Sequence, residues 1–286
     1  MASDCVRSLR EFAMAVPFIV LDSVTHLTSE HRGAVAYCAS HGGIYAGYYA
    51  AKMGVGAVIL NDAGIGRERA GVAGLELLEE AGVAAAAVSH RSARIGDGAD
   101  GVARGVLSAV NSAGLAAGLA PGMACQEALE VLVAQAGSPA RQPKPLDEAR
   151  FQEASAGRGG VTVFIMDSIS LVEPADEGHI VVSGSHGGLL AGRPETAVKY
   201  PVFAAVYSDA DRGIDEAGIS RLPALDGRGI AGACVSAFSA RIGDGRSVYE
   251  DGYISALNDT ADRAGGEIGQ SCRAFVAAMV AARLAG

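Results

Sequence analysis

The chain contains an internal duplication, and this feature constrains its fold more than any other. The segment Ser40-His41-Gly42-Gly43 returns later as Ser185-His186-Gly187-Gly188. Seven consecutive residues, 92–98, are repeated identically at 239–245, and shorter matches lie between these segments in the same order. A repeat of this length is the size of a domain. The sequence therefore predicts two similar halves and excludes a solenoid of short repeats.

The composition of the middle of the chain indicates where the halves are joined. Residues 137–160 carry three prolines, several charges and two terminal glycines, which is typical of a linker. We therefore expect a first repeat over residues 1–136 and a second over 161–286. A chain of 286 residues is long enough for each half to bury its own core.

Apolar runs that end in polar residues alternate with helical patterns in both halves. In the first half we expect helices at residues 1–15, 44–53, 69–80, 99–113 and 123–136, and strands at 17–21, 33–38, 57–60 and 83–88. In the second half we expect strands at residues 162–166, 179–183, 202–207 and 229–235, and helices at 194–198, 247–263 and 267–284. This alternation predicts an α/β fold in which each half is a mostly parallel sheet with helices on both faces.

The composition limits the kinds of molecule that we expect the protein to bind. The formal net charge of −9 argues against binding to nucleic acid or to an anionic membrane, which requires a basic surface. No apolar run approaches the roughly 18 residues of a membrane span, and the first residues do not resemble a signal peptide. The five cysteines are scattered in a way that is typical of reduced thiols. We expect a cytoplasmic homo-oligomer that acts on a small, anionic molecule.

The repeated polar residues indicate where chemistry would occur. Most follow a predicted strand, and ligands of parallel sheets bind at the carboxyl ends of the strands. The Ser-His-Gly-Gly turn places a hydroxyl, an imidazole and two glycine amides before a helix, which suits an anion or a developing oxyanion. A simpler alternative is that Ser40 and Ser185 only cap helices. Capping does not require the histidine that both copies carry.

Catalytic roles can be assigned to the repeated residues. We expect His41 and His186 to act as acid and base, with Asp62 and Asp209 orienting them. Adjacent serine and histidine side chains usually point apart, so a nucleophile would come from a neighbouring strand end. The serine candidates for that role are Ser23, Ser89 and Ser92 in the first half, and Ser168, Ser236 and Ser239 in the second.

Other repeated residues are candidates for binding the substrate. We expect Ser40 and Ser185 to hold the oxyanion together with the amides of Gly42, Gly43, Gly187 and Gly188. Ser89, Ser92, Ser236 and Ser239 are expected to contact the substrate. Arg94 and Arg241 are predicted carboxylate clamps, since a guanidinium binds a carboxylate through two parallel hydrogen bonds. Alternatively, each arginine pairs with the neighbouring Asp97 or Asp244 and stiffens its loop.

The sequence predicts no cofactor. It has neither a dinucleotide-binding fingerprint nor a phosphate loop, and no His-Glu-x-x-His segment that would indicate zinc. Candidate metal ligands are Asp22, His26, His41 and Asp62, or Asp209 and Asp211, but their spacing is not diagnostic of a metal site. His31, His90 and His179 have no duplicates, and we assign them no role in the site.

Two similar α/β halves around a cleft resemble the architecture of the aspartate/glutamate racemase group. In that group each half supplies one cysteine as acid or base. Here Cys38 aligns with Ser183, and Cys234 aligns with Ala87. The resemblance therefore concerns architecture and implies no paired-cysteine mechanism.

The function that these residues favour is hydrolysis of an amide or cyclic amide in a small carboxylate-bearing molecule, without a cofactor. The first alternative is an isomerase or lyase that uses one acid/base group from each half. The second is a protein that binds a small anion without chemistry. An isomerase or lyase should lose turnover when either histidine is replaced and should form no acyl intermediate, whereas a binding protein should release its ligand unchanged.

Overall fold

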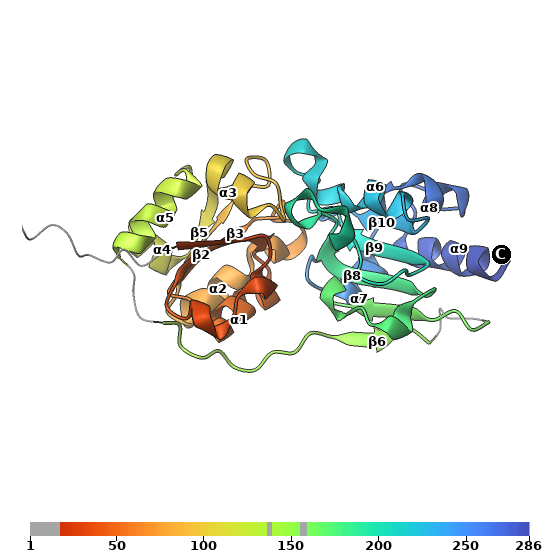
Figure 1. Cartoon of the computed structure of the whole chain (residues 1–286), viewed down its shortest axis with the longest axis horizontal. Helices are drawn as coiled ribbons and strands as arrows, with labels where there is room; N and C mark the ends of the chain where they lie inside the picture. Colours follow the sequence, from red (N-terminus) through yellow and green to blue (C-terminus); the bar gives the residue numbers. More distant parts are fainter. Residues whose placement is uncertain (1–17, 136–138, 155–158, 286) are drawn as a thin grey trace, which may run out of the picture.

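The computed structural model describes residues 18–135, 139–154 and 159–285, which form two halves that lie side by side, each with its own sheet (Figure 1). This confirms the predicted α/β fold with two similar halves. The helix expected over residues 1–15 lies outside the described residues, as does Cys5.

The first half contains a five-stranded sheet in which neighbours in space are also neighbours in sequence. Its strands are β1 (Phe18–Leu21), β2 (Val35–His41), β3 (Ala57–Asn61), β4 (Ala84–Val88) and β5 (Leu107–Val110), of which only β5 is antiparallel to its neighbour. Its α-helices are α1 (Ile44–Met53), α2 (Gly74–Glu80), α3 (Gly98–Arg104), α4 (Ser112–Ala116) and α5 (Cys125–Ala134). Short 3-10 helices are η1 (Val24–His26), η2 (Ser29–His31) and η3 (Arg67–Val72).

The second half repeats this plan with an added edge strand. Its strands are β6 (Arg150–Gln152), β7 (Val163–Met166), β8 (Ile180–His186), β9 (Ala204–Ser208), β10 (Ala231–Val235) and β11 (Ile254–Leu257), with β6 and β11 antiparallel to their neighbours. Its α-helices are α6 (Arg221–Asp226), α7 (Gly245–Asp251), α8 (Asp259–Arg263) and α9 (Cys272–Ala285). The 3-10 helices are η4 (Ile169–Leu171), η5 (Pro174–Asp176), η6 (Leu190–Gly192), η7 (Pro194–Thr196) and η8 (Ile214–Ile219).

Each sheet is covered on both faces, which explains the apolar character of its central strands. In the first half Leu78 of α2 packs in the core on one face, and Leu129 of α5 packs in the core on the other. In the second half Leu225 of α6 packs in the core on one face, as Leu78 does, and Phe275 of α9 packs in the core on the other. Strands buried on both sides read as continuous apolar runs, and this is why the periodicity predicted them well.

Two long helices predicted from the sequence are wrong in the same way. The segments 99–113 and 247–263 each form a helix, an antiparallel edge strand and a second short helix. Gly105 and Gly252 end α3 and α7 with extended backbone, at ψ 138° and 142°. The chain then pairs with the open edge of the sheet, which overrides its local helical preference. The helix predicted over 194–198 is also wrong, since only the turn η7 forms there.

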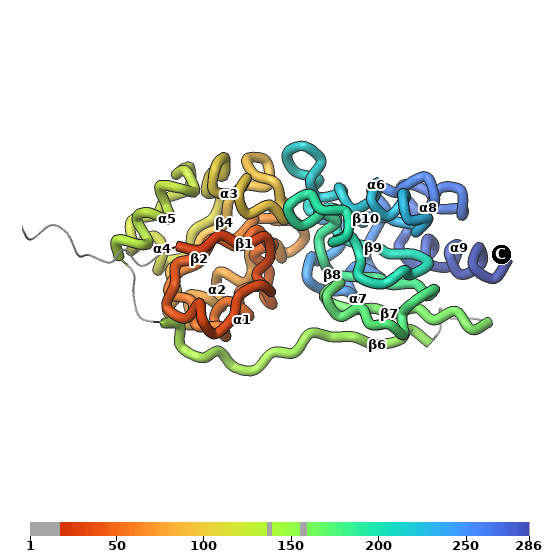
Figure 2. The backbone as a smooth tube through the Cα atoms, viewed as in Figure 1, coloured from red at the N-terminus to blue at the C-terminus, as the bar shows by residue number. Residues whose placement is uncertain are grey.

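The halves meet around a local two-fold axis. The amide of Arg67 donates to the carbonyl of Ala237 at 2.8 Å, and at the equivalent position the amide of Ile214 donates to the carbonyl of His90 at 2.8 Å. A small apolar core between the halves consists of three equivalent pairs, Ala63 with Ala210, Ala70 with Ala217, and Ile95 with Ile242. Before β6 the chain runs along one side of the molecule from the first half to the second (Figure 2).

Candidate active site

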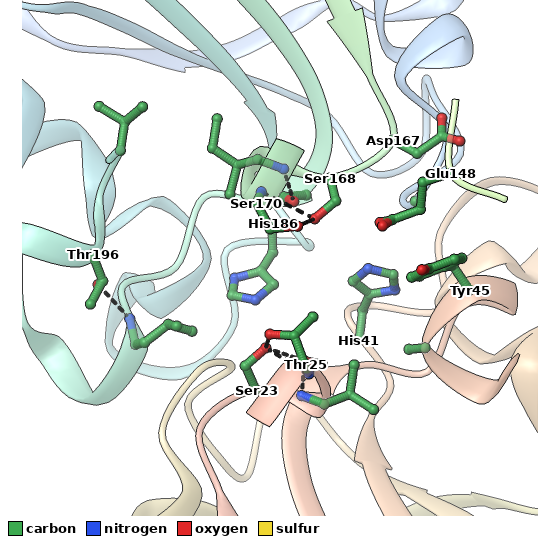
Figure 3. A pocket seen from close by; sticks show the side chains of 18 of the residues that line it. Ser23, Thr25, His41, Tyr45, Glu148, Asp167, Ser168, Ser170, His186 and Thr196 are labelled. Atoms are coloured by element: carbon green, nitrogen blue, oxygen red, sulfur yellow. Dashed lines mark hydrogen bonds between the residues drawn. The ribbon is translucent and has the colours of Figure 1, made fainter. Parts of the chain in front are cut away.

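The two Ser-His-Gly-Gly turns face one shared cavity between the halves. His41 ends β2 and His186 ends β8, and both side chains line a cavity of about 380 Å³. Their ring centroids are 6.4 Å apart and the rings are inclined at 77° to each other (Figure 3). The repeated turns therefore build one site from both halves.

Each imidazole rests against a glycine of the opposite half. A Cβ atom added to Gly243 would lie 3.2 Å from Cε1 of His41, and one added to Gly96 would lie 3.4 Å from Cε1 of His186. Both glycines have φ +83°, a conformation that favours glycine. These glycines belong to the seven-residue repeat, so each copy of that segment packs against the histidine of the other half.

Hydrogen bonds fix the tautomer of both histidines. The Gly43 amide donates to Nδ1 of His41 at 3.1 Å, and the Gly188 amide donates to Nδ1 of His186 at 3.1 Å. Because Nδ1 must accept, the proton of each neutral ring is on Nε2. Among the described residues none hydrogen-bonds to either Nε2. Both rings therefore present an N–H donor toward the cavity.

Burial keeps both rings neutral. Desolvation lowers the pKa of His41 to about 4. The pKa of His186 is also well below its ordinary value, first because of burial and then because of the positive charge of Arg221. At neutral pH these two rings are hydrogen-bond donors at Nε2 and poor bases, since their only basic nitrogen already accepts an amide.

Hydroxyl groups from the two halves face each other across the cavity. Ser23 and Thr25 are joined by a 2.8 Å hydrogen bond, and so are Ser168 and Ser170 on the opposite wall (Figure 3). The sequence singled out Ser23 and Ser168 as possible nucleophiles. Neither hydrogen-bonds to a histidine in the described part of the chain, so no serine–histidine pair forms there.

Glu148 is the functional residue that sequence reasoning missed. It belongs to the predicted linker, yet it lines the cavity on the side of His41 and Tyr45 (Figure 3). Desolvation raises the pKa of Glu148, and the hydroxyls of Tyr45 and Ser168 oppose the shift by hydrogen bonding to the carboxylate. A carboxylate with a raised pKa is a stronger base than an exposed one. At the offset of 145 residues the sequence places Ser3 opposite Glu148, so the duplication did not mark it.

The residues expected to form an oxyanion hole have other partners. The amides of Gly42 and Gly187 donate to the carbonyls of Asn61 and Ser208, both at 2.8 Å. The amides of Gly43 and Gly188 donate to the histidines, as described above. Ser40 and Ser185 accept the amides of Val24 and Ile169 at 2.9 Å, and so hold the loops that carry Ser23 and Ser168. Ser40 and Ser185 line the cavity. Ser40 does not cap α1, because the N-cap of that helix is Gly43.

Asp62 and Asp209 hydrogen-bond to neither His41 nor His186, so the prediction that they orient these histidines is wrong. Oδ1 of Asp62 is 2.8 Å from Nδ1 of His90 and also accepts the His90 amide at 2.9 Å. Asp209 accepts the amides of Asp211 and Ala237. Each aspartate also accepts a hydrogen bond at 2.7 Å from a serine of the antiparallel edge strand, Ser108 or Ser255. Through these hydrogen bonds both carboxylates hold loops at the strand ends, and neither lines the cavity.

His90, which the sequence left without a role, joins the two halves. Its Nε2 is 2.9 Å from Oδ2 of Asp211 in the second half, while Nδ1 contacts Asp62 in its own half. Burial alone would lower the pKa of His90, but the hydrogen bonds and charges of Asp62 and Asp211 raise it. We call His90, Asp62 and Asp211 the clasp. Its mirror position holds Ala237 and Gly64, so the clasp occurs once.

The predicted substrate clamps lie at the interface, outside the cavity. Arg94 contacts Asp215 of the second half at 2.7 Å, and Arg241 contacts Glu68 of the first half at 3.2 Å. Arg241 also pairs with Asp244 at 2.8 Å, as the alternative from the sequence expected. Four serines expected at the substrate serve as turn residues instead, and do not line the cavity: Ser89, Ser92, Ser236 and Ser239.

The structure and the comparisons add few further constraints. Comparison with protein-family models, with curated proteins and with solved structures finds no match for this chain. Within the described part of the chain, no three histidine, cysteine or acidic side chains are grouped so as to hold a metal ion. No helix there is long and apolar enough to cross a membrane. The four described cysteines are free and buried, and burial raises the pKa of Cys38 to about 12.

Proposed function

We propose that this protein is an enzyme that moves a proton beside the carbonyl group of a small molecule, as an isomerase or a lyase does. The observation that carries the proposal is the convergence of two neutral Nε2–H donors, one from each half, on a cavity that also contains Glu148. Neutral imidazoles polarise a carbonyl without giving up a proton, and a carboxylate with a raised pKa accepts one.

The proposed chemistry divides the work between the donors and the base. Glu148 removes a proton from the carbon next to the carbonyl, and the electron pair moves onto the carbonyl oxygen. His41 and His186 stabilise the resulting enolate oxygen through their Nε2–H groups. In an isomerase, protonated Glu148 returns the proton to a neighbouring atom of the enolate. In a lyase, Glu148 instead removes the proton of a hydroxyl group on the next carbon, the carbon–carbon bond beside the carbonyl breaks to release an aldehyde and the same enolate, and protonated Glu148 returns its proton to the enolate carbon.

Exchange with solvent tests the proposal directly. Small 2-oxo acids and hydroxy-aldehydes are incubated with the enzyme in D₂O, and proton NMR follows loss of the hydrogen next to the carbonyl. We expect exchange with at least one compound, and its abolition in Glu148→Gln. Asp147→Asn, which changes the exposed neighbouring carboxylate, serves as the control. Binding of such a compound without any exchange or conversion would instead support the non-catalytic alternative.

Hydrolysis of an amide or cyclic amide is the second candidate, because the same two donors would also stabilise a tetrahedral oxyanion. Ser40 and Ser185 hold loops, and no described serine is paired with a histidine, so Glu148 would activate water in that mechanism. Mass spectrometry after reaction of cyclic amides in H₂¹⁸O separates the two. Hydrolysis places one ¹⁸O in the product carboxylate, whereas isomerisation incorporates deuterium from D₂O at carbon.

A further inference from the structure

The end of the cavity beyond His186 carries two cations that have no carboxylate partner in the described part of the chain. Arg221, the first residue of α6, lines the cavity with only 3% of its surface exposed. Lys199, one of only three lysines in the sequence, is exposed and lines the same cavity. Thr196 marks this end in Figure 3, opposite Glu148 and Tyr45.

The hydrogen bonds of Arg221 position its guanidinium but leave its charge uncompensated. Nε donates to the carbonyl of Gly188 at 2.9 Å, and Nη1 donates to the carbonyls of Thr196 and Ala197. These acceptors carry no net charge. Burying a charge without a counter-ion is costly, so a buried cation at the wall of a cavity favours an anion inside it. The acidic residue on this wall is Glu195, which is exposed and forms no described ion pair with Arg221.

The first half has no equivalent of this charged wall. The repeat aligns Arg221 with Gly74, which allows α1 and α2 to pack closely: a Cβ at Gly47 would lie 2.5 Å from the Gly74 carbonyl oxygen. In the described second half no α-helix replaces α1. The segment that follows Gly188 forms the 3-10 helices η6 and η7, and Arg221 donates to carbonyls at the end of η7. The histidines are therefore arranged symmetrically, while the charge around them is not.

We propose that this end of the cavity is an anion subsite, which binds a carboxylate or phosphate group of the substrate through Lys199 and the positive field of Arg221. The inference rests on the proposed function only in placing the substrate in this cavity. It sets the direction of binding: the anionic group lies against the second half, the carbonyl between the imidazoles, and the carbon that loses its proton toward Glu148. A lysine supplies a mobile point charge, which suits either anion.

Binding of simple anions tests the subsite without requiring turnover. Isothermal titration with malonate and with inorganic phosphate, and with malonamide as the neutral analogue of malonate, compares the two anion chemistries. We expect malonate or phosphate to bind, malonamide to bind at least tenfold more weakly, and Lys199→Gln and Arg221→Gln each to weaken anion binding at least tenfold. Lys52→Gln, on α1 outside the cavity, should bind like the unmodified protein.

The outcome is independent of the catalytic proposal. Glu148→Gln should retain anion binding even if proton transfer proves wrong, and an anion subsite can fail while exchange in D₂O succeeds. Preference for malonate identifies a carboxylate as the ligand, and preference for phosphate identifies a phosphoryl group. If Arg221→Gln lowers the melting temperature, Lys199→Gln decides, because that side chain is exposed. Unchanged affinity in Lys199→Gln, equal binding of malonamide, or no anion binding at all would overturn the inference.

Discussion

The cleft and the clasp lie at the same interface and both contain histidine, yet they shift its pKa in opposite directions. In the cleft, burial without a carboxylate lowers the pKa of His41 to about 4. In the clasp, Asp62 and Asp211 overcome the effect of burial and raise the pKa of His90. The difference comes from the second partner of each ring. An amide donating to Nδ1 requires a neutral ring, whereas two carboxylates favour a charged one.

This contrast leads us to expect that the cleft serves turnover and that the clasp serves stability. We expect a neutral ring with a free Nε2–H to polarise a ligand, and it forms no ion pair between the halves. A charged ring between two carboxylates joins the halves and has no nitrogen left for a ligand. We therefore expect substitutions in the cleft to change turnover at nearly constant stability, and substitutions in the clasp to do the reverse.

The largest expected effect is on turnover in the cleft. Glu148→Gln should lower the rate of proton transfer roughly 10²- to 10⁴-fold, because it removes the base and keeps the shape of the side chain. Its melting temperature should stay within a few degrees of that of the unmodified protein. Deuterium exchange and thermal unfolding measure the two quantities. Exchange at the original rate in this variant would remove Glu148 from the mechanism.

The support of the imidazole can be disturbed from the opposite half. Gly243→Ala places a Cβ 3.2 Å from Cε1 of His41 and should lower turnover roughly 10²-fold by displacing the ring. It also strains a backbone with φ +83° by about 1–2 kcal/mol. Gly229→Ala is the matched control, since Gly229 has φ +66° and no atom within 4 Å of the added Cβ. Equal loss of turnover in both variants would show that strain alone is responsible.

Breaking the clasp should reduce stability and spare the chemistry. Asp211→Asn removes the carboxylate that contacts Nε2 of His90 across the interface. We expect a loss of about 1–3 kcal/mol in unfolding free energy at pH 6, measured by urea denaturation. Turnover should change less than threefold. A turnover loss as large as that of Glu148→Gln would mean that the clasp and the cleft are not separate.

The pH dependence of the unfolding free energy should show both the lowered pKa of His41 and the raised pKa of His90. The lowered pKa of His41 means that its contribution is present above pH 6.5 and is lost as the pH falls toward 4, by about 3 kcal/mol at most. The raised pKa of His90 gives the opposite sign: its contribution is present below pH 6.5 and is lost as the pH rises through the pKa of the folded protein. His41→Gln should flatten only the acidic limb, and His90→Asn only the alkaline one.

The sequence predicted the architecture better than the site. Apolar runs buried on both faces identified the parallel strands, and the duplication identified the two halves and both histidines. Edge strands were missed, because β5 and β11 form only where a neighbouring strand offers an open edge. Asp62 and Arg94 were misassigned for a related reason: repetition marks residues that build the interface as strongly as those that bind a ligand. Glu148 carries no repeat, and only the path of the chain brings it to the cavity.

The seating of each histidine on a glycine of the other half has one more consequence. Neither half alone contains a complete donor pair, and each donor packs against a glycine of the other half. If the halves rotate apart, both Nε2–H groups lose their backing glycine in the same movement, and the point on which they converge ceases to exist. The proposed donor pair therefore forms only when the interface between the two halves is closed.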